Sequence, residues 1–278
     1  MRLSKFIVVP ALVLALSPAF GQLADDMEDE TRFYAQTKQV NQFFRRFNGE
    51  ENEKGDRYYP DDRQYRNTKL RKKYIAMLFD GGNASFSNDL KAEFAKDVID
   101  KDKPGILDFH APGLTAELHT IFTVAGKDQP VTMFMELEPD HLGYKWVISN
   151  VYSDVFATYF KRDTTRIGQF LHPMSHELAF MNLRKAFMNP DSVAQFASKK
   201  YVPDYLTLFL YELRRGTIKF KYVSDVKFHF FQIPGWYFEL AEFNRPGYNT
   251  GWLISNLVKI KTDQDKEALR KFIYHETP

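Results

Sequence analysis

Apolar residues in the first part of the chain have the spacing of amphipathic helices. Between residues 29 and 48 they recur at intervals of three or four, which places them on one face of a helix. These positions are Phe33, Val40, Phe43, Phe44 and Phe47. The same spacing predicts two further helices, over 66–79 and 88–99.

The pattern then changes to that of β-strands. The segments 114–124, 131–137 and 144–152 are rich in β-branched and aromatic residues. Turn-forming residues at Gly126-Lys127-Asp128 and at 139–143 separate them. We therefore expect three antiparallel strands joined by hairpins.

The second half of the chain repeats this order of helices followed by strands. Ser175 is a suitable N-cap for a helix that Asn189-Pro190 ends. The later elements are predicted as a helix, three strands and a terminal helix, over 203–214, 218–232, 235–242, 251–261 and 263–274.

A short sequence repeat accompanies the repeated order of elements. The first copy reads Glu136-Leu137, Gly143-Tyr144 and Trp146-Val147-Ile148-Ser149-Asn150. The second copy reads Glu239-Leu240, Gly247-Tyr248 and Trp252-Leu253-Ile254-Ser255-Asn256. The chain has only three tryptophans, so this match predicts two modules, over 22–160 and 161–278, with a boundary near 157–173.

Helices followed by a strand meander predict an α+β fold in each of two tandem modules, with N-terminal helices packed on a curved antiparallel sheet. This order resembles the nuclear-transport-factor-two-like superfamily, which includes ketosteroid isomerase and scytalone dehydratase, and its tandem versions in exported bacterial proteins. A cystatin-like arrangement fits the same order. The resemblance implies a pocket between sheet and helices, which some relatives use for acid–base chemistry.

The N-terminus has the pattern of a secretory signal peptide. Arg2 and Lys5 precede an apolar run, and the small residues Ala19 and Gly21 predict cleavage after Gly21. The run is too short to favour a membrane span, so we expect a periplasmic or secreted bacterial protein without stable membrane insertion.

The amino-acid composition of the chain excludes several kinds of site and partner. The chain has no cysteine, which excludes disulfides, thiolate metal sites and cysteine nucleophiles. Without Arg2 and Lys5, the 38 basic residues become 36 and equal the 36 acidic ones, so we expect no nucleic-acid partner. The basic run from Arg63 to Lys73 is best interpreted as a solvated helix face, the alternative being an anionic partner.

The repeated acids Glu136 and Glu239 are the first catalytic candidates, because a carboxylate in an apolar pocket can act as a general acid or base. Strand alternation offers a structural alternative, in which Tyr237 and Glu239 share the polar face of their strand. Tyr237, Asn150 and Asn256 are candidate ligand contacts.

Histidines supply the remaining candidates. Asp108, His110 and His119 lie before and within the first predicted strand and could form an acid–base cluster, although ordinary polar positions explain them equally. His172 and His176 could share a metal on one helix, but a helix start between them disfavours this, and no metal site is predicted.

The module is duplicated without duplicated catalytic residues. This predicts an exported, non-enzymatic protein that binds a small ligand or an envelope protein partner, without a cofactor. The alternative is a pocket enzyme of isomerase, dehydratase or hydrolase type, with a buried carboxylate or histidine in one module. Pairing of curved sheets would give a homodimer.

Overall fold

The computed structural model describes residues 40–52, 54–83, 85–141, 143–159, 184–188, 193, 196–198, 200–246 and 249–276. Several expectations fall outside these residues. They are the signal peptide, the start of the first helix, the helix expected to begin at Ser175, the pair His172 and His176, and most of the module boundary.

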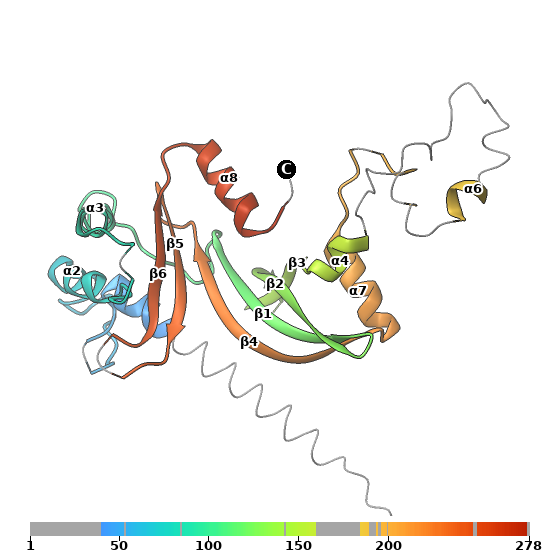
Figure 1. Ribbon diagram of the computed structural model, residues 1–278. Coiled ribbons are helices and arrows are strands. Elements are labelled where there is room, and N and C mark those ends of the chain that lie inside the picture. The colour runs from blue at the N-terminus through green and yellow to red at the C-terminus, as the bar shows by residue number, and fades with distance from the viewer. Residues whose placement is uncertain are drawn as a thin grey trace, which may run out of the picture.

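The fold is α+β, with one six-stranded antiparallel sheet (Figure 1). Its strands are β1 (Leu114–Val124), β2 (Lys127–Asp140), β3 (Gly143–Tyr152), β4 (Ile218–Phe230), β5 (Trp236–Phe243) and β6 (Gly251–Lys259). The helices are the helical residues 40–48, α2 (Thr68–Met77), α3 (Asn88–Val98), α4 (Asp154–Tyr159), α6 (Arg184–Phe187), α7 (Tyr205–Arg215) and α8 (Asp263–Ile273).

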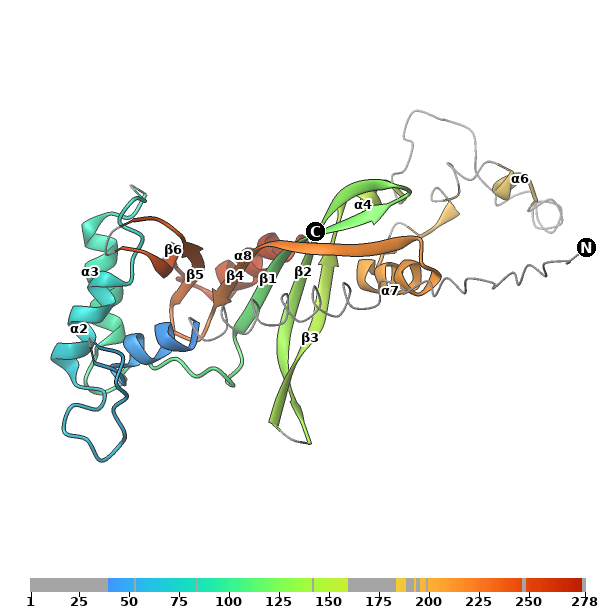
Figure 2. The ribbon, with the colours of Figure 1, turned by 90° about the horizontal axis from the view of Figure 1, so that it is seen from below.

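The strand order is β3-β2-β1-β4-β5-β6, so both meanders belong to a single sheet. β1 and β4 pair along their whole length, from Leu114 opposite Phe230 to Val124 opposite Ile218. β4 is long and runs from the α7 end of the molecule to the end that carries α2 and α3 (Figure 2). The expectation of a separate sheet for each half is therefore replaced by one continuous sheet.

The main hydrophobic core lies between one face of the sheet and the N-terminal helices. The 40–48 helix contributes Phe43 and Phe47, and α3 contributes Phe94, whose ring contacts Phe238 of β5 at 5.8 Å. A second cluster forms where α7 inserts Phe209 beside Phe122 of β1. These clusters are the apolar faces that the spacing predicts.

Helix α8 lies over the opposite face of the sheet (Figure 1). A capping box at Thr262 and Asp265 begins it. Just after its end, Tyr274 bonds through Oη to Thr115 Oγ1 of β1 at 2.6 Å. Asn150 Nδ2 of β3 donates to the Tyr274 carbonyl oxygen at 2.9 Å, so the C-terminal turn is tied to both strands.

The predicted strands are confirmed, with β2 longer than expected at both ends. So are the helices at α2, α3, α7 and α8. The β1–β2 turn is shorter than predicted, because Ala125 and Gly126 alone form it with φ of 48° and 79°. This is the left-handed conformation that two-residue hairpin turns require.

The sequence repeat marks the two outer hairpins of the sheet. A register shift follows Phe134 in the β2–β3 pair, and another follows Glu239 in the β5–β6 pair. At each shift the repeat serine donates across the strands over 3.3 Å, Ser149 to the Phe134 carbonyl and Ser255 to the Glu239 carbonyl. The Ser-Asn part of the repeat therefore specifies a β-bulge.

The two repeat tryptophans pack on one phenylalanine. The ring of Phe228, on β4, lies 6.2 Å from Trp146 and 5.3 Å from Trp252. Trp252 is 5% exposed, whereas Trp146 is half-buried. Both indoles thus anchor the sheet to its core.

Candidate functional site

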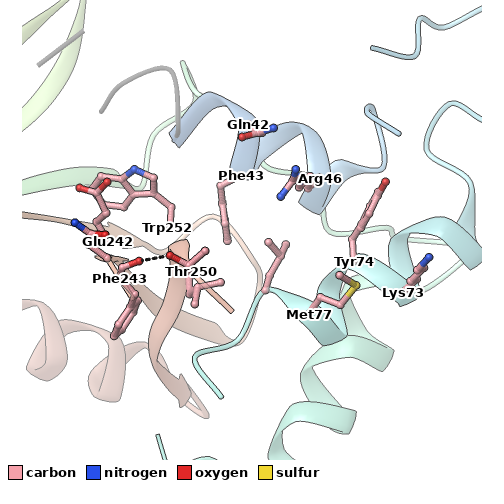
Figure 3. A pocket seen from close by; sticks show the side chains of 14 residues that line it. Gln42, Phe43, Arg46, Lys73, Tyr74, Met77, Glu242, Phe243, Thr250 and Trp252 are labelled. Carbon is pink, nitrogen blue, oxygen red and sulfur yellow. Dashed lines mark hydrogen bonds between the residues drawn. The ribbon is translucent and has the colours of Figure 1, made fainter. Parts of the chain in front are cut away.

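A cavity of about 720 Å³ lies between the N-terminal helices and the outer end of the β5–β6 hairpin. Its walls come from the 40–48 helix, from α2 and from the strand ends that meet around Phe243 and Trp252 (Figure 3). This volume is in the range of pockets that hold small organic ligands.

The cavity walls are mainly apolar. Phe43 extends from the 40–48 helix, Met77 and Leu78 come from the end of α2, and Trp252 comes from β6. Met77 is 55% exposed, so an apolar side chain stands at the mouth. The polar part of the lining consists of Gln42, Arg46, Lys73, Tyr74, Glu242, Asn244 and Thr250.

Trp252 lines this wall with its ring, while its one polar atom is inaccessible to solvent. Its Nε1 is buried and has no hydrogen-bond partner among the described residues. An indole N–H can only donate, and a buried donor without an acceptor costs about 1–3 kcal/mol.

A buried carboxylate holds the helical wall in place. Glu51 is fully buried and accepts hydrogen bonds from Gln42 Nε2 at 3.1 Å, Arg45 Nε at 2.8 Å and Arg46 Nε at 3.1 Å. Because Gln42 and Arg46 line the cavity, this cluster fixes the polar groups of that wall before any ligand arrives.

The loop between β5 and β6 is tied to the end of α2. Arg245 donates to Asp80 Oδ1 and to the carbonyl oxygen of Asn249, and Asn249 Nδ2 donates to the Phe79 carbonyl oxygen at 2.8 Å. Burial raises the pKa of Asp80, but the hydrogen bonds from Arg245 and from the Gly82 N–H together lower it below the ordinary value. The ionised Asp80 thus stabilises the closed end of the hairpin beside the cavity.

A buried polar network occupies the other face of the sheet, and we define it as Glu117, His119, His229 and Tyr237. Glu117 Oε2 bonds to His229 Nε2 at 2.6 Å, and Glu117 Oε1 bonds to His119 Nε2 at 2.5 Å. The second ring nitrogen of His229, Nδ1, lies 2.9 Å from Tyr237 Oη. Three strands, β1, β4 and β5, contribute these groups.

The network favours an ionised carboxylate beside a neutral phenol. Burial raises the pKa of Glu117, but the hydrogen bonds and charges of His229 and His119 outweigh it and lower the pKa to about 2. Burial, followed by the charges of Glu239 and Glu117, raises the pKa of Tyr237 above its ordinary value. His229 is 1% exposed, and both its ring nitrogens contact protein groups. The network therefore has a structural role, in which it links three neighbouring strands of the sheet.

The candidate acids of the repeat occupy different positions in the two hairpins. When the two outer hairpins are aligned on their bulges, Glu239 corresponds to Phe134, and Glu136 corresponds to Ala241. Glu239 accepts from Ser255 Oγ at 2.7 Å and lies 3.6 Å from Lys227 Nζ. Glu136 is half-buried, and its charge adds to burial in raising the pKa of Tyr274.

The other candidates are dispersed. His110 Nδ1 lies 3.9 Å from Asp108 Oδ1 on an exposed loop, whereas His119 pairs with Glu117 on β1 and stays partly exposed. Among the candidate ligand contacts, Tyr237 belongs to the network, and Asn150 holds the Tyr274 carbonyl. Asn256 is exposed on β6.

Glu117 and His229 were not among the candidate residues that the sequence indicated. Alternation of polar residues at 115, 117 and 119 in a strand was the available signal for Glu117. The described part of the chain holds no cluster of three His, Asp or Glu residues able to bind a metal ion. Within the same part, no helix has the length and apolarity needed to cross a membrane.

Comparisons with known proteins give no family model, no curated protein and no solved structure that matches this chain. The proposed function therefore rests on the geometry of the site alone.

Proposed function

We propose that this protein binds a small amphipathic ligand in the cavity between the N-terminal helices and the β5–β6 hairpin. The observation that carries the proposal is a ligand-sized cavity in which the apolar side chains of Phe43, Met77 and Trp252 lie beside polar groups that Glu51 holds in place. The ligand would place an apolar body between Phe43, Met77 and Trp252 and an acceptor group beside Gln42 and Arg46.

Binding fits the geometry better than catalysis. The polar network contains acid–base side chains, but its His229 already uses both ring nitrogens on Glu117 and Tyr237. A histidine acts as a general base through a free ring nitrogen within hydrogen-bond reach of a substrate proton. The cavity lies on the other face of the sheet from this network, against the core side that holds Trp252.

A fluorescence titration with 1-anilinonaphthalene-8-sulfonate tests the proposal, because this probe combines an apolar ring system with an acceptor. Trp252→Phe keeps an aromatic ring but reduces the apolar surface of the cavity wall, and we expect it to weaken probe binding about 5-fold or more. Met77→Trp fills the mouth and should weaken binding further.

Trp146→Phe is the matched control, because Trp146 packs on the same Phe228 ring but does not line the cavity. Equal probe affinity for the Trp252→Phe variant, the Trp146→Phe variant and the unmodified chain would refute the cavity as the binding site.

We also propose that the two halves of the sheet derive from one duplicated α+β unit, as in tandem members of the nuclear-transport-factor-two-like superfamily. The support is the order β3-β2-β1-β4-β5-β6, in which each half extends outward from a central strand, together with the bulge at Ser149 and Ser255. Export to the periplasm is proposed from the N-terminal pattern around Arg2, Lys5 and Gly21.

A further inference from the structure

Strand β3 forms one edge of the sheet. Its inner side pairs with β2 through most of its length. On its outer side, no described residue forms a backbone hydrogen bond with the segment from Lys145 to Ile148. An open strand edge of this kind is a surface on which another extended chain can pair.

The opposite edge of the sheet shows such a pairing. On β6, the Ile254 N–H donates to the Leu78 carbonyl oxygen at 2.7 Å, and the Asp80 N–H donates to the Ile254 carbonyl oxygen at 3.0 Å. Phe79 lies opposite Ile254 in a parallel bridge. The short segment after α2 therefore acts as an added parallel strand.

Ile148 occupies on β3 the position that Ile254 occupies on β6. Each isoleucine is two residues after the repeat tryptophan and directly precedes the bulge serine. Ile148 lies opposite Met135 of β2, and Ile254 lies opposite Leu240 of β5. In each case the partner strand is the one next to the edge strand. The N–H and C=O of Ile148 thus point outward in the geometry that accepts Leu78–Asp80 on the other edge.

The apolar surface beside this position is also incompletely covered. Leu240 and Ile254 are fully buried under Phe79 and the N-terminal helices, whereas Met135 and Ile148 are half-buried. A side chain placed opposite Ile148 would therefore bury apolar surface that the described part of the chain leaves accessible.

We propose that the outer edge of β3 binds an extended segment of a partner protein, parallel to β3 and centred opposite Ile148, with an apolar aromatic residue at its centre. The central residue of the bound segment takes the place that Phe79 has on β6. The backbone groups of the two residues beside it bond to the Ile148 N–H and C=O. A second copy of this chain related by a twofold axis would present β3 antiparallel, which differs from the pairing seen on β6.

The probe is a blocked peptide that copies residues 76–81, Ala-Met-Leu-Phe-Asp-Gly. Amide hydrogen exchange measured by NMR reports on single backbone groups. We expect the peptide to slow exchange at the Ile148 N–H and to leave the Val147 N–H, which faces the other way along the pleat, unchanged.

Two N-methylated peptides provide a matched pair. Methylation at the Asp position removes the N–H that corresponds to the Asp80 donor and should weaken binding about 5-fold. Methylation at the Phe position alters an N–H that points away from β3 and should have a smaller effect. In the protein, Ile148→Pro removes the outward donor at an edge position where proline is tolerated, and binding should be lost with the fold retained.

Unchanged exchange at Ile148 with millimolar peptide would overturn the proposal, as would equal binding by both methylated peptides. Protection of the Ile148 N–H without peptide, together with a dimeric mass by light scattering, would assign this edge to a second copy and overturn it as well.

Discussion

The ion-paired state of Glu117 makes a defined contribution to folding stability that depends on pH. Its pKa falls from an ordinary value of 4.5 to about 2 in the folded protein. The folded value is the lower one, so this stabilisation is fully present above about pH 4.5 and is lost as the pH falls toward 2. The shift sets an upper limit of about 3 kcal/mol, which solvent at the 13% exposed side chain reduces to about 2 kcal/mol.

Glu117→Gln tests this reasoning, because glutamine keeps the shape of the side chain and removes its charge. Urea unfolding followed by circular dichroism should show the variant about 2 kcal/mol less stable than the unmodified chain at neutral pH. The difference should shrink below pH 4.5 and approach zero near pH 2.

Glu138→Gln is the control, because Glu138 is exposed on β2 outside the network, and its stability difference should stay near zero across this range. A stability difference for Glu117→Gln that stays constant from neutral pH to pH 2.5 would refute the ion pair as its source.

Three further variants test the packing and the helix ends. Phe228→Ala removes the ring between Trp146 and Trp252 and should cost about 3–5 kcal/mol in thermal unfolding, whereas a cost below about 1 kcal/mol would contradict its central place. Gly216→Ala at the C-cap of α7, where φ is 73°, should cost about 1 kcal/mol in urea, and open space around the new Cβ leaves strain as the only cause. Thr262→Ala removes the capping box and should speed amide exchange within α8 by about 5-fold while leaving α7 unchanged.

Local patterns were sufficient to place most elements of the fold. The interval of three to four apolar positions and the alternation in strands depend on neighbouring residues, so helices such as α3 and strands such as β1 follow from the sequence. The pairing of β1 with β4 joins positions far apart in the chain, and no local pattern encodes it.

The difference between local patterns and long-range pairing also explains which residues of the site could be predicted. Glu117 and His229 meet only because β1 and β4 are adjacent. In the sequence each is an ordinary polar residue of a strand, so the hydrogen bond between them could not be predicted. The likeness of Glu136 to Glu239 was misleading, because the bulges set the register and align Glu239 with Phe134. The two repeat tryptophans both pack on Phe228, although no local pattern indicates that they meet on one ring.

The central β1–β4 ladder has a consequence for how the chain folds. The strands within each meander are joined by short connections and can pair early, whereas the ladder from Leu114–Phe230 to Val124–Ile218 must close a long loop. Until it closes, each half exposes its inner strand as a second unpaired edge. Refolding is therefore expected to be slow and sensitive to protein concentration, because the inner edge of one chain can join that of another.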